Sequence, residues 1–459
     1  MANRQDRRHT HGQRAGPGQE VSERRRRLRS EAGQPPDDDS RLDPVDERGD
    51  IPDHRAHRPE QDQAPFDQFT LARRRARSWM RLHDRYNYSK GVLAGPRGQC
   101  YNMAWPNSSV MDEAIAREFL ICPACRTGPF TIIPFERDDR GLVHGILRCD
   151  ACRSWYRVED RLPELLPHDL RDAARGRAFM ARFHDRWQGW SSGSAPAPVP
   201  SDGSRVLKAE QMEFFRTQAG RYDDGITAAP FWIAFDRLFL DAIGRAGAKR
   251  GVLVEVGCGT GRLAPRLAEA FRTLLGFDLS EAMAREAMRR FSACGTLPGR
   301  ALHFVADADH IPVRGGAADC VLFAGVLSYV AMPAVALAES VRILAEDGVL
   351  LGHENNASVF RPCFDLLMAL HESWVAKSYP PHGALSGADL VGWLGAAGMS
   401  ASYRTEVFLP PHVFNLLPPS RAERLMRFTN ATASRLPWIR RQGGLLLFSG
   451  RRKGTMEVR

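Results

Sequence analysis

The feature that most constrains the fold is an apolar run, residues 252–263, that ends in an acid and a glycine-rich turn (VLVEVGCGTGRL). Its β-branched residues are typical of a buried parallel strand. Glycines at the carboxyl end of such a strand let the backbone turn tightly and approach a ligand without Cβ collisions. A dinucleotide-binding turn needs Gly-x-Gly-x-x-Gly, but Arg262 stands at the last glycine position and Gly261 comes one residue too early. The pattern therefore predicts a nucleotide-like ligand other than NAD.

A second acid lies where a ribose-binding carboxylate is expected. Residues 274–278 (LLGFD) predict another strand, and Asp278 follows Gly257 by 21 residues. A carboxylate can accept hydrogen bonds from both hydroxyls of a ribose. We therefore take Asp278 as a candidate sugar ligand, a role that is compatible with capping the following helix.

Five ordered segments resemble the class I S-adenosylmethionine (SAM) dependent methyltransferases. They are the acid and glycines of 255–261, then residues 278–283, 304–312, 319–323 and 342–351. Ordered matches over about a hundred residues are more specific than one glycine turn. The resemblance implies an α/β fold, a doubly wound, Rossmann-like, seven-stranded methyltransferase sheet. We expect its strands near 251–256, 273–278, 302–306, 319–324, 348–353, 400–409 and 444–450.

The same resemblance implies the cofactor site. The glycine turn and Glu255 would contact the methionine part of SAM. Asp278 would bind the ribose, and Leu279 would lie against the adenine face. A third acid would accept from the adenine amino group, and a tyrosine would close over the cofactor, although ordinary helix packing is an equal alternative for it. An aromatic residue would line the path to the acceptor. The implied residues are Tyr222, Glu255, Gly257, Gly259, Gly261, Asp278, Leu279, Asp307, Ala308 and Phe323.

Catalysis needs little from the protein. Methyl transfer from a sulfonium is an in-line displacement with an activated leaving group, so the enzyme must chiefly align the two reactants. An oxygen or nitrogen acceptor can need a base, and His353, at the end of a predicted strand, is a weak candidate. A purely structural histidine is the alternative.

Two cysteine pairs predict a metal centre. Cys122 and Cys125 form one C-x-x-C pair, Cys149 and Cys152 form another, and 23 residues separate the pairs. Four thiolates so arranged suit a closed structural zinc site, and the gap, longer than the usual range of roughly 15–20 residues, has room for a β-hairpin. Chance pairing or a lost metal is the alternative. Disulfides are not expected in a chain that looks cytosolic.

The sequence around these cysteines resembles a small zinc-ribbon family. The resemblance covers residues 119–125 and 147–166. Eukaryotic members of that family activate tRNA and protein methyltransferases as separate subunits, which implies that here a ribbon is fused to its catalytic partner. An rRNA guanine methyltransferase family also carries an N-terminal ribbon, but its fourth ligand is usually histidine where this chain has Cys152.

Composition changes predict the domain organisation. We expect a disordered basic and polar tail, a helical lead-in, the zinc ribbon, a helix with a flexible linker, and then the methyltransferase domain. Two insertions in that domain are long enough to be substrate lids, with a dimer surface or extra packing as alternatives. In order, the domains are 1–65, 66–118, 119–168, 169–204 and 205–453, and the insertions lie around 355–397 and 411–437.

Charge alone does not decide the partner. The net charge is +10, but arginine dominates the basic residues, a bias that a GC-rich coding sequence can produce. The first thirty residues lack the apolar core of a signal peptide, and the apolar stretch 321–338 contains Ser328, Tyr329 and Pro333. We therefore expect a cytoplasmic protein with no membrane partner, and leave its oligomeric state open.

The leading functional hypothesis is transfer of a methyl group to an oxygen, nitrogen or carbon atom of a small molecule. One alternative is a tRNA or rRNA methyltransferase that binds RNA through the ribbon and arginines. Against it, residues 324–329 (AGVLSY) lack the Asn- or Asp-Pro-Pro-aromatic loop of many base-amino methyltransferases. A non-catalytic SAM-binding or interaction protein is the third hypothesis.

Overall fold

The computed structural model describes residues 111–186, 203–220, 222–223, 229–294, 300–362 and 383–453. All of them belong to one compact unit, Phe66–Arg459. The predicted tail, most of the helical lead-in and most of the linker lie outside the described residues.

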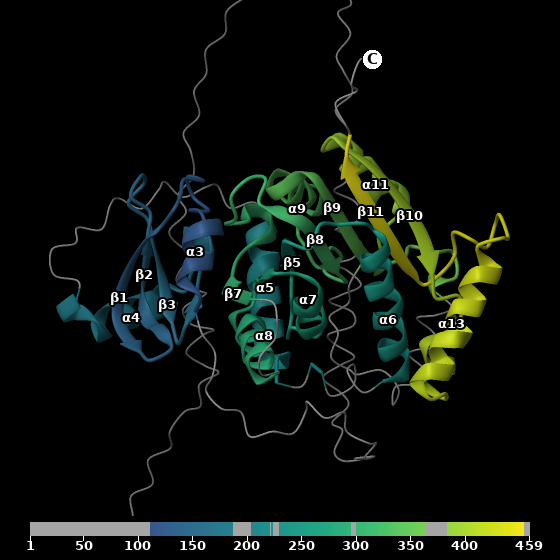
Figure 1. Ribbon diagram of the computed structural model, residues 1–459, viewed down its shortest axis with the longest axis horizontal. Helices are drawn as coiled ribbons and strands as arrows, with labels where there is room; N and C mark the ends of the chain where they lie inside the picture. Colours follow the sequence, from purple (N-terminus) through teal and green to yellow (C-terminus); the bar gives the residue numbers. More distant parts are fainter. Residues whose placement is uncertain are drawn as a thin grey trace, which may run out of the picture. The chain divides into compact units, whose positions relative to one another are not determined.

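The centre of this unit is a seven-stranded mixed sheet with the order β10-β11-β9-β8-β5-β6-β7 (Figure 1). The five strands from β9 to β7 run parallel, and β11 and β10 add an antiparallel end. This order and these directions confirm the predicted Rossmann-like methyltransferase sheet. The strands are β5 (Val252–Val256), β6 (Thr273–Asp278), β7 (Arg300–Val305), β8 (Ala318–Ala324), β9 (Leu344–Asn355), β10 (Met399–Glu406) and β11 (Leu445–Arg452).

Helices cover both faces of the sheet because its central strands are apolar on both sides. In β5, Leu253 packs in one hydrophobic cluster and Val254 in another, as expected for side chains that alternate across a strand. In β6, Leu274 and Leu275 divide in the same way. The helices are α5 (Gly203–Gln218), α6 (Pro230–Arg245), α7 (Ala264–Ala270), α8 (Glu281–Ala293), α9 (Pro333–Ile343), α11 (Gly387–Ala396), α12 (Pro411–Asn415) and α13 (Pro419–Ala433).

A smaller, antiparallel sheet precedes this one, with the order β1-β2-β3-β4. It contains the hairpin expected between the cysteine pairs, since β1 and β2 pair along their length. The elements are α3 (Glu113–Phe119), β1 (Thr131–Asp138), β2 (Gly141–Arg148), β3 (Trp155–Glu159), β4 (Leu162–Pro163) and α4 (Ala173–Arg182).

The small sheet is joined to the large one through backbone pairing. The N–H of Leu165 donates to the carbonyl of Val305, the last residue of β7, at 2.7 Å. The N–H of Ile121 donates to the carbonyl of Pro312 at 3.0 Å. Phe119 and Leu120 share one hydrophobic cluster with residues of the large sheet. Because an open strand edge invites pairing with other chains, these contacts protect the β7 edge.

None of the helices among the described residues has the length and apolarity needed to cross a bilayer.

Candidate active site and metal centre

A cavity lies at the carboxyl ends of the parallel strands. Its walls come from the glycine turn after β5, the ends of β6 and β8, the loop after β7, and α5. Eight of the ten predicted cofactor residues line it, namely Tyr222, Glu255, Gly257, Gly259, Asp278, Leu279, Asp307 and Ala308. Gly261 and Phe323 do not line it.

The three glycines of the turn have φ angles of 65°, 54° and 73° at Gly257, Gly259 and Gly261, which side chains other than glycine rarely adopt. A Cβ on Gly257 would stand 2.2 Å from the Val326 side chain, and one on Gly261 would stand 2.9 Å from Ala287. A Cβ on Gly259 would meet nothing within 4 Å, so this residue faces open space. Packing therefore requires two of the glycines, whereas the third leaves room for a ligand.

Glu255 lies at the end of β5 with 2% exposure. Its Oε2 has no hydrogen-bond partner among the described residues. Burial raises the pKa of Glu255 to about 8, so the isolated carboxyl is protonated at neutral pH. A buried acceptor without a donor is costly, and the ammonium group of a bound amino acid would supply the missing partner.

Asp278 holds the glycine turn against the start of α8. Its Oδ2 accepts from the N–H of Gly259 at 3.0 Å, and its Oδ1 accepts from the N–H of Ser280 at 2.8 Å. Burial raises the pKa of Asp278 to about 6. Each oxygen keeps a second lone pair, so the carboxylate can also accept from ribose hydroxyls. The helix-capping role and the ligand role are thus compatible.

Asp307 has a partner that the sequence analysis missed. The ammonium of Lys208, on α5, lies 2.7 Å from Asp307 Oδ2 and 2.5 Å from Asp309 Oδ2. All three side chains are buried. Although burial opposes it, a hydrogen bond from His310 and the charge of Lys208 lower the pKa of Asp307. The one signal in the sequence was rarity, because the chain has only five lysines among its 64 basic residues.

Helix α5 forms one wall of the cavity through Lys208, Gln211, Met212 and Phe215. The free volume is about 120 Å³, below the roughly 300 Å³ at which ordinary ligand sites begin. The polar groups fit the methionine and ribose parts of SAM, and α5 bounds the free space on one side.

The structure does not bring His353 into the cavity. Its ring packs edge-on against Phe235 and Phe239, with centroid distances of 5.0 and 4.7 Å. Burial lowers the pKa of His353 to about 3, and neither ring nitrogen has a partner within the described part of the chain. A base must reach the proton that it removes, and this ring is enclosed behind the cavity wall. Phe323 is likewise fully buried, whereas its neighbour Ala324 lines the cavity.

The second predicted lid segment, residues 411–437, stands apart from the cavity as well. Helix α13 packs on α6, where Arg237 pairs with Glu423 at 3.1 Å. No residue of 411–437 lines the cavity. The middle of the other insertion, residues 363–382, lies outside the described residues.

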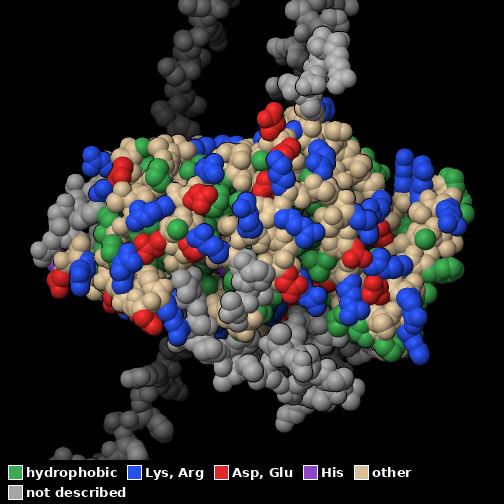
Figure 2. All heavy atoms as spheres, viewed as in Figure 1, with side chains coloured by type: hydrophobic (Ala, Val, Ile, Leu, Met, Phe, Trp, Pro, Cys, Tyr) green, Lys and Arg blue, Asp and Glu red, His purple; other side chains and the backbone are tan. Residues whose placement is uncertain are grey.

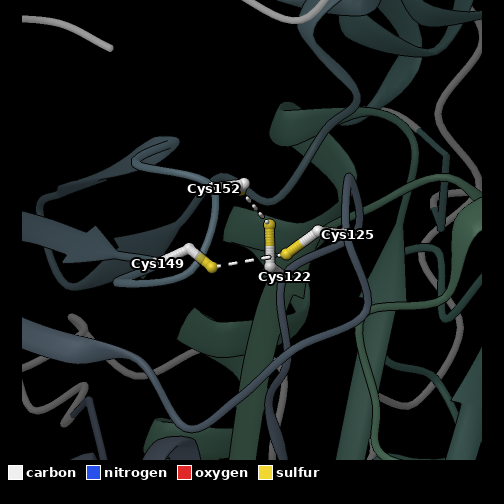
Figure 3. Close-up of side chains that lie close together, drawn as sticks. All are labelled: Cys122, Cys125, Cys149 and Cys152. Carbon is white, nitrogen blue, oxygen red and sulfur yellow. Dashed lines mark hydrogen bonds between the residues drawn. The ribbon is translucent and has the colours of Figure 1, made fainter.

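The four cysteines come together as predicted (Figure 3). Their sulfur atoms all lie within 4.8 Å of one another, with Cys122 to Cys152 at 3.6 Å and Cys125 to Cys149 at 3.4 Å. Tetrahedral zinc with Zn–S bonds of about 2.3 Å places sulfurs about 3.8 Å apart. The donor set and its spacing therefore fit one zinc ion.

The two cysteine turns have the same backbone geometry. The N–H of Arg126 donates to the carbonyl of Cys122, and the N–H of Arg153 donates to the carbonyl of Cys149. Both arginines have positive φ, 61° and 65°. A hydroxyl group from Tyr156 lies 3.1 Å from the sulfur of Cys122. Two matched turns and a supporting hydroxyl make this a preformed cage of four sulfur atoms.

Comparison with known proteins shows what residues 254–352 resemble. They match the family described as Methyltransferase domain. A malonyl-[acyl-carrier protein] O-methyltransferase of Geobacter sulfurreducens is 34% identical over 108 residues, 22% of this chain and 38% of that protein. A protein of Geobacillus sp. strain WCH70, named as a methyltransferase, is 43% identical over 74 residues, 16% of this chain and 29% of that protein. The chain thus spans less than two fifths of the length of these curated relatives.

A solved SAM-dependent methyltransferase of Thermotoga maritima is 20% identical and covers 52% of this chain and 99% of its own, with a TM-score of 0.36. The residues that match the family, 254–352, contain most of the five parallel strands of the observed sheet. Residues 254–352 therefore carry a methyltransferase domain of the class I, SAM-dependent type.

Proposed function

We propose that this protein uses SAM to methylate an oxygen, nitrogen or carbon atom of a small molecule. The observation that carries the proposal is the buried Glu255 carboxyl, which lacks a donor and lies beside a glycine turn that leaves open space at Gly259. The bound cofactor would supply an activated methyl group. The residues of the chain then hold and align: Glu255 takes the ammonium, Asp278 the ribose hydroxyls, and Asp307 the adenine amino group.

The charges in the cavity favour a small acceptor over RNA. Its only lining cations within the described chain are Lys208 and Arg262, and both pair with aspartates. No lining cation is thus left over for a phosphate backbone. Apolar and aromatic side chains make up most of the remaining wall, including Met212, Phe215 and Tyr329. An acceptor that approaches the methyl group along this wall would need an apolar body.

We further propose that the four-cysteine cage holds a structural zinc ion. A closed set of four thiolates leaves no open position for a substrate. The metal would hold the small sheet in its folded form. Because residues of that sheet cover the β7 edge, the metal would also keep this edge from pairing with strands of other chains.

Titration calorimetry with SAM tests the cofactor site. We expect SAM to bind the full chain, and Asp278→Ala to weaken that binding by at least tenfold. The control is Asp347→Asn, which should leave the affinity unchanged because Asp347 is exposed and does not line the cavity. Absence of binding to the intact protein would remove the proposal. Incubation with methyl-labelled SAM and a metabolite extract then separates an enzyme from a non-catalytic binder, because only the enzyme gives a labelled product. Retention on RNA at two salt concentrations tests the RNA alternative.

A further inference from the structure

Large apolar side chains are exposed near the C-terminus, around α12, α13 and the loop that follows. Leu416 is 69% exposed, Phe428 68%, Leu436 41% and Trp438 70%. We call the exposed side chains of residues 416–441 the basic apolar surface. Single exposed apolar residues are ordinary, but four large ones within residues 416–438 are more than such scattered exposure explains.

The same segment concentrates positive charge. Residues 411–442 contain six arginines and a single acid, Glu423, a net charge of +5 within a chain whose total is +10. Glu423 pairs with Arg237 and Arg427. The other five arginines have no ion pair with any described residue; they are Arg421, Arg424, Arg435, Arg440 and Arg441. Figure 2 shows basic and hydrophobic side chains gathered at the right-hand edge of the molecule, where α13 lies.

The phase of α13 puts charge and apolar surface on one side. Ala422, Met426 and Ala433 are its buried residues. Arg421, Arg424 and Phe428 follow a spacing of three and four, so they share the opposite face. The helix therefore packs through one stripe and presents arginine and phenylalanine together on the other.

A groove beside this helix is lined by further arginines. Its volume is about 520 Å³, and Arg404, Arg440, Arg441 and Ser434 contribute to its walls. Arg404 pairs with Glu406, whereas Arg440 and Arg441 are exposed. Glu406 also lines the groove and binds Arg404, so Arg440 and Arg441 are the two lining guanidinium groups without an ion pair among the described residues, and such groups suit a phosphate.

The loop that carries these arginines is fixed at the carboxyl edge of the large sheet. The side-chain amide of Asn356 donates to the carbonyls of Arg441 and Gly443 at 3.0 and 2.7 Å. Asn356 directly follows β9, and Ala324, at the end of the neighbouring β8, lines the cavity. The loop and the cavity thus belong to the same edge of the sheet.

We propose that the basic apolar surface docks the protein on membranes rich in anionic phospholipids, with lipid phosphates in the arginine-lined groove. Exposed leucine, phenylalanine and tryptophan beside arginines form the combination that binds a lipid interface. In a symmetric dimer formed through this surface, two segments of net charge +5 (residues 411–442 of each copy) would face each other, and their repulsion disfavours such a contact. Leu416 and Leu436 would gain nothing on RNA, where aromatic stacking and charge bind. The proposal goes beyond the methyltransferase function and does not depend on it.

This proposal revises the expectation of no membrane partner. No helix of the described residues is long and apolar enough to cross a bilayer. Binding to a membrane surface needs no bilayer-crossing segment. The sequence did not predict that Trp438 is exposed.

Co-sedimentation of the full chain with lipid vesicles tests the proposal. We expect binding to vesicles of phosphatidylcholine mixed with phosphatidylglycerol, little binding to phosphatidylcholine alone, and weaker binding at high salt. Each arginine near an anionic surface contributes about fivefold in partitioning, so Arg440→Glu with Arg441→Glu should lower it by at least about twentyfold. Phe428→Ser with Trp438→Ser should weaken binding even at low salt. The matched control is Arg177→Glu, an exposed arginine on α4.

Equal loss with Arg177→Glu, or no vesicle binding, would overturn the membrane assignment. Retention on RNA that the Arg440 and Arg441 variants abolish, without vesicle binding, would reassign the surface to nucleic acid. A dimer in sedimentation equilibrium that Trp438→Ser dissociates would reassign it to a second copy of the chain. Unchanged circular dichroism and melting temperature confirm that each variant folds.

Discussion

Lys208 on α5 lies 2.7 Å from the carboxylate of Asp307, in the wall of the cavity that we assign to the cofactor. The pair connects the helix in front of the cavity to the loop after β7. The carboxylate expected to recognise adenine is therefore already engaged by the ammonium group of Lys208.

Lys208→Met should destabilise the protein by about 3–5 kcal/mol, because the substitution leaves two buried carboxylates without a cation. Asp309→Asn added to that variant should recover part of the loss, since burial and the charge of Asp307 already raise the pKa of Asp309. Urea unfolding of the two single variants and the double variant measures this coupling. Equal stability of Lys208→Met and the parent protein would show that the pair contributes nothing.

Glu255 should make both stability and cofactor affinity depend on pH. Its pKa is raised by burial from 4.5 to about 8, so the folded state holds a proton that the unfolded state releases, and stability should fall as the pH rises across that window. Glu255→Gln should flatten this slope. If the ionised carboxyl binds the cofactor ammonium, SAM affinity should rise with pH up to about 8, by at most tenfold per unit. Calorimetry from pH 6 to 8.5 tests this, and a flat profile would argue against the ion pair.

His353→Leu should leave methyl transfer largely intact and make the fold more resistant to acid. Burial lowers the pKa of His353 from 6.5 to about 3, so below about pH 6.5 the unfolded state binds a proton that the folded state does not, and stability falls as the pH drops through that window. The leucine variant lacks this term. Its advantage in melting temperature should therefore be larger at pH 5 than at pH 7.5. A loss of turnover with cofactor binding unchanged would restore the histidine as a catalytic candidate.

The cysteine cage should hold one zinc ion per chain, released by a mercurial reagent and counted with a chromogenic chelator. Cys149→Ser should abolish that zinc and lower the melting temperature, because Cys122 and Cys149 lie in a hydrophobic cluster with residues of the large sheet. Cys294→Ser, which removes a cysteine outside the cage, is the matched control. Full zinc content in the Cys149 variant would place the metal elsewhere.

Removal of residues 1–186 should expose the β7 edge together with the apolar residues beneath α3. We expect the remaining chain to bind a dye for exposed hydrophobic surface and to aggregate at concentrations where the full chain does not. Static light scattering during refolding provides the measurement. A monomeric, cofactor-binding truncated chain would show that the small sheet is dispensable for stability.

The central strands were predictable because local pattern and tertiary role agree in them. An apolar run that ends in an acid or glycine predicts a buried strand from local sequence alone, and the sheet contains a strand at those residues, as β5 and β6 show. The cysteine cage was predictable for a similar reason, since its ligand spacing is encoded in two short local motifs.

What the sequence could not provide were relations between distant elements. Lys208 and Asp307 are 99 residues apart in the sequence. No local sequence pattern predicts that α5 lies next to the loop after β7. His353 looked like a strand-end base because its enclosure depends on phenylalanines from α6. Trp438 is large and apolar, which favours burial, yet it is 70% exposed.

The pairing of Leu165 with Val305 has a further consequence, because both partners belong to one polypeptide. A tethered partner acts at an effective concentration in the millimolar range, so this association survives any dilution in the cell. A free subunit that sought the same strand would have to displace a covalently linked competitor. Stoichiometry is then set at translation, and the cell need not balance the synthesis of two separate chains.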